Sequence, residues 1–238
     1  MRLNDFTALG DAFEGMKSPV AAGGAFDFTS ISGCQLWIDG ADGSGKTESE
    51  GKVAVFPDKS GNDNHATQDT QSKMPTHNTT DGIILGTDQY LVFGTEINYS
   101  PAKHIFIVFD ANATMTSNAP FLGHTTKVPT FNTKYSGRRL LNDVSYYRND
   151  DVLTDFYRNS VDAAASVVLD DSIDDYTSPT LVRMYISTRA YFDTLASDRE
   201  LGGRTFAANS KEILVYNALS AEDIATVESE LMSKWGIS

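Results

Sequence analysis

The segment from Gly40 to Thr47 has the residue pattern of a phosphate-binding loop, with glycines, a lysine and a threonine at the required spacing. An apolar run from Ile105 ends at Asp110 and resembles the strand whose carboxylate holds magnesium in such sites. Phosphate binding also needs a helix that opens at Gly45 and crosses back to a parallel strand, yet the next strand pattern already begins at Val53. Nucleotide binding is therefore a remote alternative, and a chance match in a loop is favoured.

Four side chains near this loop have the oxygen atoms that calcium prefers as ligands. They are Asp39, Asp42, Asp58 and Asn62. Asp58 could instead cap the amides of residues 60–64, whose types tolerate positive φ angles and favour turns. A structural turn is the favoured interpretation and a calcium site is the alternative, so calcium is the one cofactor that the sequence suggests. The acidic run at residues 170–175 is expected to be solvated surface.

Aromatic and basic residues in the middle of the chain could bind a glycan without chemistry. Tyrosine rings stack on the CH faces of sugars, and arginine donates to their hydroxyls. The candidates are Tyr146, Tyr147, Arg148, Tyr157 and Arg158. A role in the core or in a subunit contact is an equal alternative for these tyrosines.

Catalytic patterns are missing from the sequence. Retaining glycosidases need two carboxylates about 5 Å apart on one sheet face, and no glutamate here is followed by an aspartate two positions later. The four histidines have no metal-ligand spacing, and no Gly-x-Ser-x-Gly elbow occurs. Cys34 is the single cysteine, which excludes an intrachain disulfide and a cysteine zinc cage. We expect a protein that is not an enzyme.

The elements that position these residues must come from a chain of 238 residues with a formal net charge of −13. Such acidity argues against an extended nucleic-acid surface, and no apolar run approaches the roughly 20 residues that cross a membrane. The N-terminus has acids where a signal peptide needs an apolar stretch, so we expect synthesis and folding in a cytoplasm.

Residues 1–30 are expected to form an arm. Phe6, Leu9, Phe13 and Met16 recur at helical spacing and would form one apolar face on a short helix. A helix of this length is not stable alone, and a segment rich in proline and glycine follows it. The arm is therefore expected to anchor the protein to a partner, with a simple structural extension of the domain as the alternative.

Residues 31–238 have the pattern of an all-β domain. Short runs rich in β-branched and aromatic residues alternate with clusters of Gly, Asn, Asp and Ser, which is typical of a sandwich or jelly roll. The runs are 35–38, 53–56, 83–85, 90–93, 104–109, 166–169, 181–187 and 212–216. One helix is predicted near the C-terminus, with Ser220 as its N-cap, a core stripe that includes Val227 and Leu231, and Gly236 beyond its end.

Two parts of this domain resemble a known family. The opening, from Leu36 to Ser44 and from Val53 to Gln68, is similar to the laminin-G-like, concanavalin A-like jelly-roll domains of phage virion and bacterial surface proteins. The closing stretch from Lys211 to Gly236 resembles the final strand and helix of that family.

This resemblance implies a concanavalin A-like jelly roll and a structural protein of a virion or cell surface, of the capsid decoration or fibre type. Its location would be the virion surface, the arm would bind other virion or surface proteins, and the jelly roll would contact host glycans. A homo-oligomer is expected by analogy. A stand-alone carbohydrate-binding module is the alternative.

Overall fold

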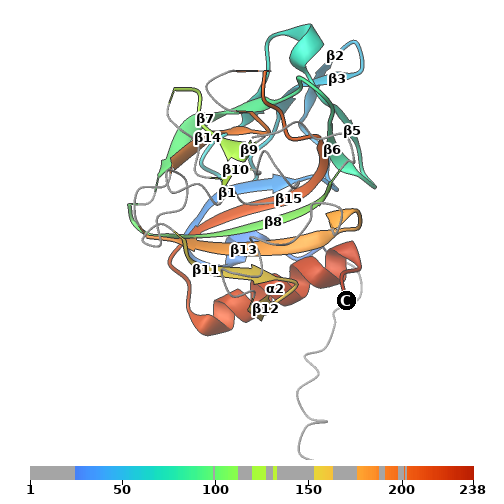
Figure 1. Ribbon diagram of the computed structural model, residues 1–238. Helices are drawn as coiled ribbons and strands as arrows, with labels where there is room; N and C mark the ends of the chain where they lie inside the picture. The colour runs from blue at the N-terminus through green and yellow to red at the C-terminus, as the bar shows by residue number, and fades with distance from the viewer. Residues whose placement is uncertain are drawn as a thin grey trace, which may run out of the picture.

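The computed structural model describes residues 25–98, 100–111, 120–126, 131–132, 153–162, 176–187, 191–197, 201 and 203–238. Strands pair into two antiparallel sheets that lie face to face (Figure 1). The expected all-β sandwich with a C-terminal helix is thus confirmed. The expected arm residues Phe6, Leu9, Phe13 and Met16 lie outside the described residues, as do Tyr146, Tyr147 and Arg148.

The first sheet, called sheet A, has β15 near its centre. β15 pairs with β8 on one side, and on the other side β6 pairs with its first half and β1 with its second half. In order the strands are β12 (Val161–Asp162), β11 (Leu153–Arg158), β13 (Thr180–Ile186), β8 (Lys103–Ala111), β15 (Ala208–Asn217), β6 (Gly82–Leu85) and β5 (Thr76–Asn78), with β1 (Cys34–Asp39) beside β6.

The second sheet, called sheet B, is built from shorter strands. In order they are β10 (Phe131–Asn132), β9 (Pro120–Gly123), β14 (Tyr191–Leu195), β7 (Leu91–Asn98), β4 (Ala66–Thr67), β3 (Lys52–Phe56) and β2 (Thr47–Ser49). In the described part of the chain, the short 3₁₀ helices η1 (Phe28–Ser30) and η2 (Gln71–Lys73) lie in connections.

Strand β8 is apolar along nearly its whole length because both of its faces are buried. Ile105, Ile107 and Phe109 belong to the core between the two sheets. Phe106 and Val108 point to the opposite face and belong to a second core under the C-terminal helix. Alternation of side chains along a strand thus divides one apolar run between two cores.

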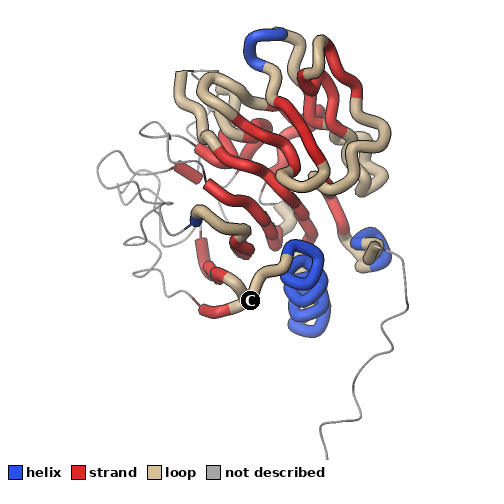
Figure 2. The backbone as a smooth tube through the Cα atoms, turned by 90° about the vertical axis from the view of Figure 1, so that its right-hand side faces the viewer, coloured by secondary structure: helices blue, strands red, loops and turns tan. Residues whose placement is uncertain are grey.

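The helix α2 (Ala221–Trp235) covers the outer face of sheet A, as Figure 2 shows from the side. The Ser220 hydroxyl accepts a hydrogen bond from the backbone amide of Asp223, and Gly236 ends the helix at a φ of 64°. Both caps agree with the prediction. Val227 and Leu231 are fully buried, and each contributes roughly 1.5–3 kcal/mol by leaving water.

Residues just before the predicted domain boundary also pack in this second core. The Phe28 ring lies edge-on to Trp37, with 5.4 Å between the ring centroids. The Phe28 carbonyl accepts a hydrogen bond from the Tyr216 hydroxyl at 2.9 Å. Residues 26–31 therefore contact the sandwich, although the sequence suggested that the arm extends to residue 30.

Candidate functional site

The loop that follows β3 is shaped by Asp58, whose side chain is 7% exposed. Its Oδ1 accepts hydrogen bonds from the backbone amides of Trp37 and Ser60, each at 2.9 Å. Its Oδ2 accepts from the backbone amide of Asn64 at 3.0 Å and from the Ser60 hydroxyl at 2.8 Å. Asp58 therefore caps the loop's amides, which is the structural role that the sequence favoured over a calcium ligand.

Two asparagines of this loop tie the two sheets together at one end of the sandwich. The Asn62 amide donates to the carbonyls of Cys34 and Gln35 at the start of β1, at 3.1 and 3.2 Å. The Asn64 side chain pairs with the backbone of Thr95 in β7, donating to its carbonyl at 3.3 Å and accepting from its amide at 2.6 Å. The loop thus bridges sheet A and sheet B.

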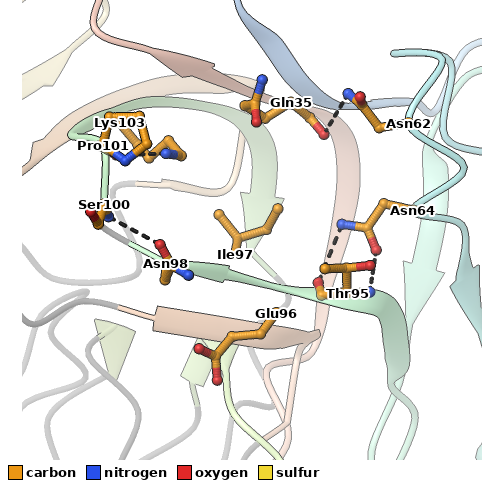
Figure 3. Close-up of a pocket in the computed structure, with 10 residues that line it drawn as sticks. All are labelled: Gln35, Asn62, Asn64, Thr95, Glu96, Ile97, Asn98, Ser100, Pro101 and Lys103. Carbon is orange, nitrogen blue, oxygen red and sulfur yellow. Dashed lines mark hydrogen bonds between the residues drawn. The ribbon is translucent and has the colours of Figure 1, made fainter.

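A polar pocket of about 260 Å³ opens beside this bridge (Figure 3). It lies between the start of β1, the capped loop, the end of β7 and the start of β8. We call it the amide pocket, and it is lined by Gln35, Asn62, Asn64, Thr95, Glu96, Ile97, Asn98, Ser100, Pro101 and Lys103.

Several polar groups of the amide pocket keep free hydrogen-bonding capacity. Among the described residues, no partner is found for Gln35 Oε1, Asn62 Oδ1, Asn98 Nδ2 or Ser100 Oγ. Carboxamides offer both donors and acceptors, and a hydroxyl offers both from one atom. The arrangement suits a ligand that carries many hydroxyl groups.

Lys103 forms part of the pocket wall and is 5% exposed. Its Nζ donates to the Pro101 carbonyl at 2.5 Å. Burial lowers the pKa of this lysine, because a charged ammonium loses hydration when it leaves water. Nothing in the sequence pointed to this position, because Lys103 precedes an apolar strand run and looks like an ordinary strand end.

Asp39 and Asp42, two of the predicted calcium ligands, converge on a lysine. Lys59 Nζ lies 3.0 Å from Asp39 Oδ2 and 3.0 Å from Asp42 Oδ2. Hydrogen bonds from Ser44, together with Lys59, lower the pKa of Asp42 to about 2. In the described part of the chain, no group of three or more His, Cys, Asp or Glu side chains could hold a metal ion. Calcium binding stays a prediction.

Asp39 also belongs to a charge cluster under α2 that the sequence did not reveal. Lys234 of the helix lies 2.6 Å from Asp39 Oδ1 and 2.7 Å from Glu212 Oε2. Glu212 further accepts from the indole nitrogens of Trp37 and Trp235, at 2.7 and 3.0 Å. Burial raises the pKa of Glu212 to about 7 despite the attraction of Lys234. These contacts fix the end of α2 on sheet A.

The segment from Gly40 to Thr47 does not lead into a helix. Gly40 follows β1, and Thr47 begins β2, which forms an antiparallel hairpin with β3. Lys46 Nζ bonds Glu48 at 2.6 Å and His77 at 3.1 Å. The helix N-terminus on which phosphate binding depends is therefore replaced by a hairpin at this point.

Tyr157 and Arg158 neighbour each other on β11 but contact different layers. The Arg183 guanidinium carbon lies 3.6 Å from the Tyr157 ring centre, and Arg183 pairs with Glu228 of α2 at 2.7 Å. The Arg158 guanidinium instead lies 5.7 Å from the ring centre of Tyr176, a residue of the core between the sheets. The two side chains do not form one joint platform for a sugar.

All four histidines bond the backbone. His65 and His104 each accept from a main-chain amide at 3.0 Å, and so does His124. His77 Nε2 lies 2.9 Å from a main-chain carbonyl oxygen. His124 Nε2 also lies 2.6 Å from Glu96 Oε2 on sheet B. These contacts support the structural role that the sequence suggested for the histidines.

Comparison with known proteins returned no match among protein-family models, curated proteins or solved structures. None of the helices in the described ranges is both long and apolar enough to cross a membrane.

Proposed function

We propose that this protein is a non-catalytic structural protein of a virion or cell surface and that its amide pocket binds host glycans. The observation that carries this proposal is the set of carboxamide and hydroxyl groups that line one small pocket of the sandwich. The location at the virion surface and the attachment to other virion or surface proteins through the arm follow from the resemblance of the sequence.

The chemistry of the pocket favours a sugar over an apolar ligand. Side-chain carboxamides pair with the hydroxyl groups of sugars because each offers donors and an acceptor in one plane. Ile97 and Pro101 add an apolar part to the wall, against which the CH groups of a sugar ring can pack. The volume of about 260 Å³ lies just below the roughly 300–1,000 Å³ of pockets for drug-sized ligands. This size suits a ligand of about one sugar residue.

The finer fold assignment is part of the proposal. We infer a concanavalin A-like, laminin-G-like jelly roll. Two antiparallel sheets face each other, and the final strand β15 leads into α2 at the positions where the resemblance expects a strand and a helix. Asp58 organises the loop that the opening motif contains.

Calorimetric titration and a glycan array test the binding function. We expect millimolar or tighter binding of at least one glycan. Thr95→Trp places a bulky ring at an exposed position of the pocket wall and should weaken that binding at least tenfold. Thr79→Trp makes the same change at an exposed turn outside the pocket and should leave the affinity unchanged.

Two results would overturn this proposal. One is an array and a titration in which no glycan binds at millimolar concentration. The other is a bound glycan whose affinity is the same in Thr95→Trp and the wild type, which would place the binding site elsewhere. Tyr146→Ala and Tyr147→Ala then test the sugar contacts that the sequence suggested.

A further inference from the structure

We propose that the amide pocket binds an acidic sugar residue and that Lys103 holds its carboxylate. This inference rests on the proposed glycan binding and adds the chemical class of the ligand.

Lys103 is a buried cation, and the described residues place no opposite charge beside it. Its Nζ makes one hydrogen bond, to the Pro101 carbonyl, which leaves two of the three ammonium hydrogens for other acceptors. Within the described ranges of the chain, no carboxylate lies within 4.0 Å of Lys103 Nζ. Loss of hydration lowers its pKa, and no acid among the described residues acts against this shift.

Lys103 differs in this respect from two other lysines, one buried and one partly buried. Lys211 is similarly buried, and its Nζ lies 3.1 Å from Asp110. Lys234 lies between Asp39 and Glu212. The chain has 32 acidic and 19 basic residues, so carboxylates are abundant. An unpaired ammonium is costly in the interior, and a ligand with a negative group would supply the missing partner.

The acid that lines the same pocket does not neutralise Lys103. The carboxylate of Glu96 points away from the other labelled side chains in Figure 3. It lies 2.6 Å from Nε2 of His124, which belongs to sheet B. A negative charge that pairs with Lys103 must therefore come from outside the residues that line the amide pocket.

The other groups of the pocket restrict what kind of anion fits. Carboxamides of Gln35, Asn62 and Asn98, with the Ser100 hydroxyl, surround the space beside Lys103. Hydroxyl groups of a sugar ring can occupy these donors and acceptors while an ionised group on the ring meets the ammonium. A hexuronate and a sialic acid both combine a carboxylate with ring hydroxyls. A sulfated sugar is also negatively charged, and the test distinguishes it from these two carboxylates.

The test compares each acid with its uncharged form. Isothermal titration calorimetry would use glucuronate and N-acetylneuraminate, each beside its methyl ester, and glucose 6-sulfate. For the wild type, we expect at least one of the two carboxylates to bind tenfold or more tightly than its ester.

In the variant Lys103→Met, that acid should bind no better than its ester, while the affinity for the ester stays within about twofold of the wild-type value. Lys103→Arg keeps a cation and should retain a preference for the acid. Lys52→Met, a half-buried lysine outside the pocket, should leave every affinity unchanged.

Each other outcome overturns a defined part of the inference. If acid and ester bind the wild type equally, or Lys103→Met retains the preference for the acid, the role of Lys103 is wrong and the glycan proposal stands. If the 6-sulfate binds and both carboxylates fail, the anion is a sulfate and the assignment of a carboxylate is wrong. If no sugar of either kind binds and the glycan array is also empty, the proposed function itself fails.

Discussion

The substitution Lys234→Met should destabilise the protein strongly and in a pH-dependent way. Lys234 Nζ lies 2.6 Å from Asp39 and 2.7 Å from Glu212, two carboxylates that are 3% and 0% exposed. Methionine keeps the length of the side chain and removes its charge. The two buried acids then lose the cation between them, although Asp39 keeps its contact with Lys59.

The cost depends on whether Glu212 is ionised. At pH 8, above its pKa of about 7, the substitution leaves a buried charge without its partner and should cost about 3–5 kcal/mol. At pH 5 Glu212 is protonated in the folded state, so the remaining loss is the contact with Asp39, about 2 kcal/mol.

The raised pKa of Glu212 also affects the stability of the wild type. Its contribution to stability is fully present below the unfolded-state value near 4.5 and is lost as the pH rises through 7.

Urea unfolding followed by tryptophan fluorescence measures this cost. The chain has two tryptophans, and both indole nitrogens donate to Glu212, so the signal reports on this cluster directly. Lys46→Met is the matched control. It removes a lysine from a more exposed pair with Glu48 and should cost less than about 1 kcal/mol.

A double variant separates the unpaired charge from lost packing. Adding Glu212→Gln to Lys234→Met removes the carboxylate together with its cation, so the double variant should recover most of the stability lost at pH 8. The reasoning is refuted if Lys234→Met costs less than about 1 kcal/mol at pH 8, or if its cost is the same at pH 5 and pH 8.

The remaining predictions use the same unfolding assay. Gly82→Ala should cost more than about 3 kcal/mol, because Gly82 has a φ of 79° and an added Cβ would overlap the Ser210 carbonyl oxygen. Gly61→Ala is the control for this substitution. Gly61 also has a positive φ, 85°, but an added Cβ would meet no atom within 4 Å, so the substitution should cost about 1 kcal/mol. Equal costs for the two substitutions would contradict the steric explanation. Asp58→Asn should cost about 2–4 kcal/mol, because an amide cannot accept all four hydrogen bonds of the buried carboxylate. It should also weaken glycan binding through the displaced loop, and a stable variant with unchanged affinity would refute that link.

Elements with continuous apolar sequence could be predicted, while those that depend on distant pairing could not. The runs at 104–109 and 212–216 lie within β8 and β15, because a strand buried on both faces is apolar at nearly every position. β14 was not expected, since Asp193 and Thr194 interrupt its apolar pattern. Pairing with β7 and β9 holds it in sheet B instead.

In the candidate site, too, features set by neighbouring residues could be predicted, and features set by distant residues could not. The types of residues 60–64 correctly indicated a rigid turn capped by Asp58. The pocket beside that turn was not foreseeable, because it depends on the contact between Asn64 and Thr95, 31 positions apart. The partner of Asp39 was equally hidden, since Lys234 lies 195 positions further along the chain. The carboxylates of Asp39 and Asp42 suggested a metal site, but in the structure they contact lysine side chains instead.

The packing of Phe28 beside α2 determines on which face of the domain the described chain begins. Phe28 and the helix residues Val227 and Leu231 belong to one cluster on the outer face of sheet A. The described chain therefore begins on the face that the helix covers. Any attachment through the proposed arm would start from that face, and sheet B lies on the opposite side of sheet A from it.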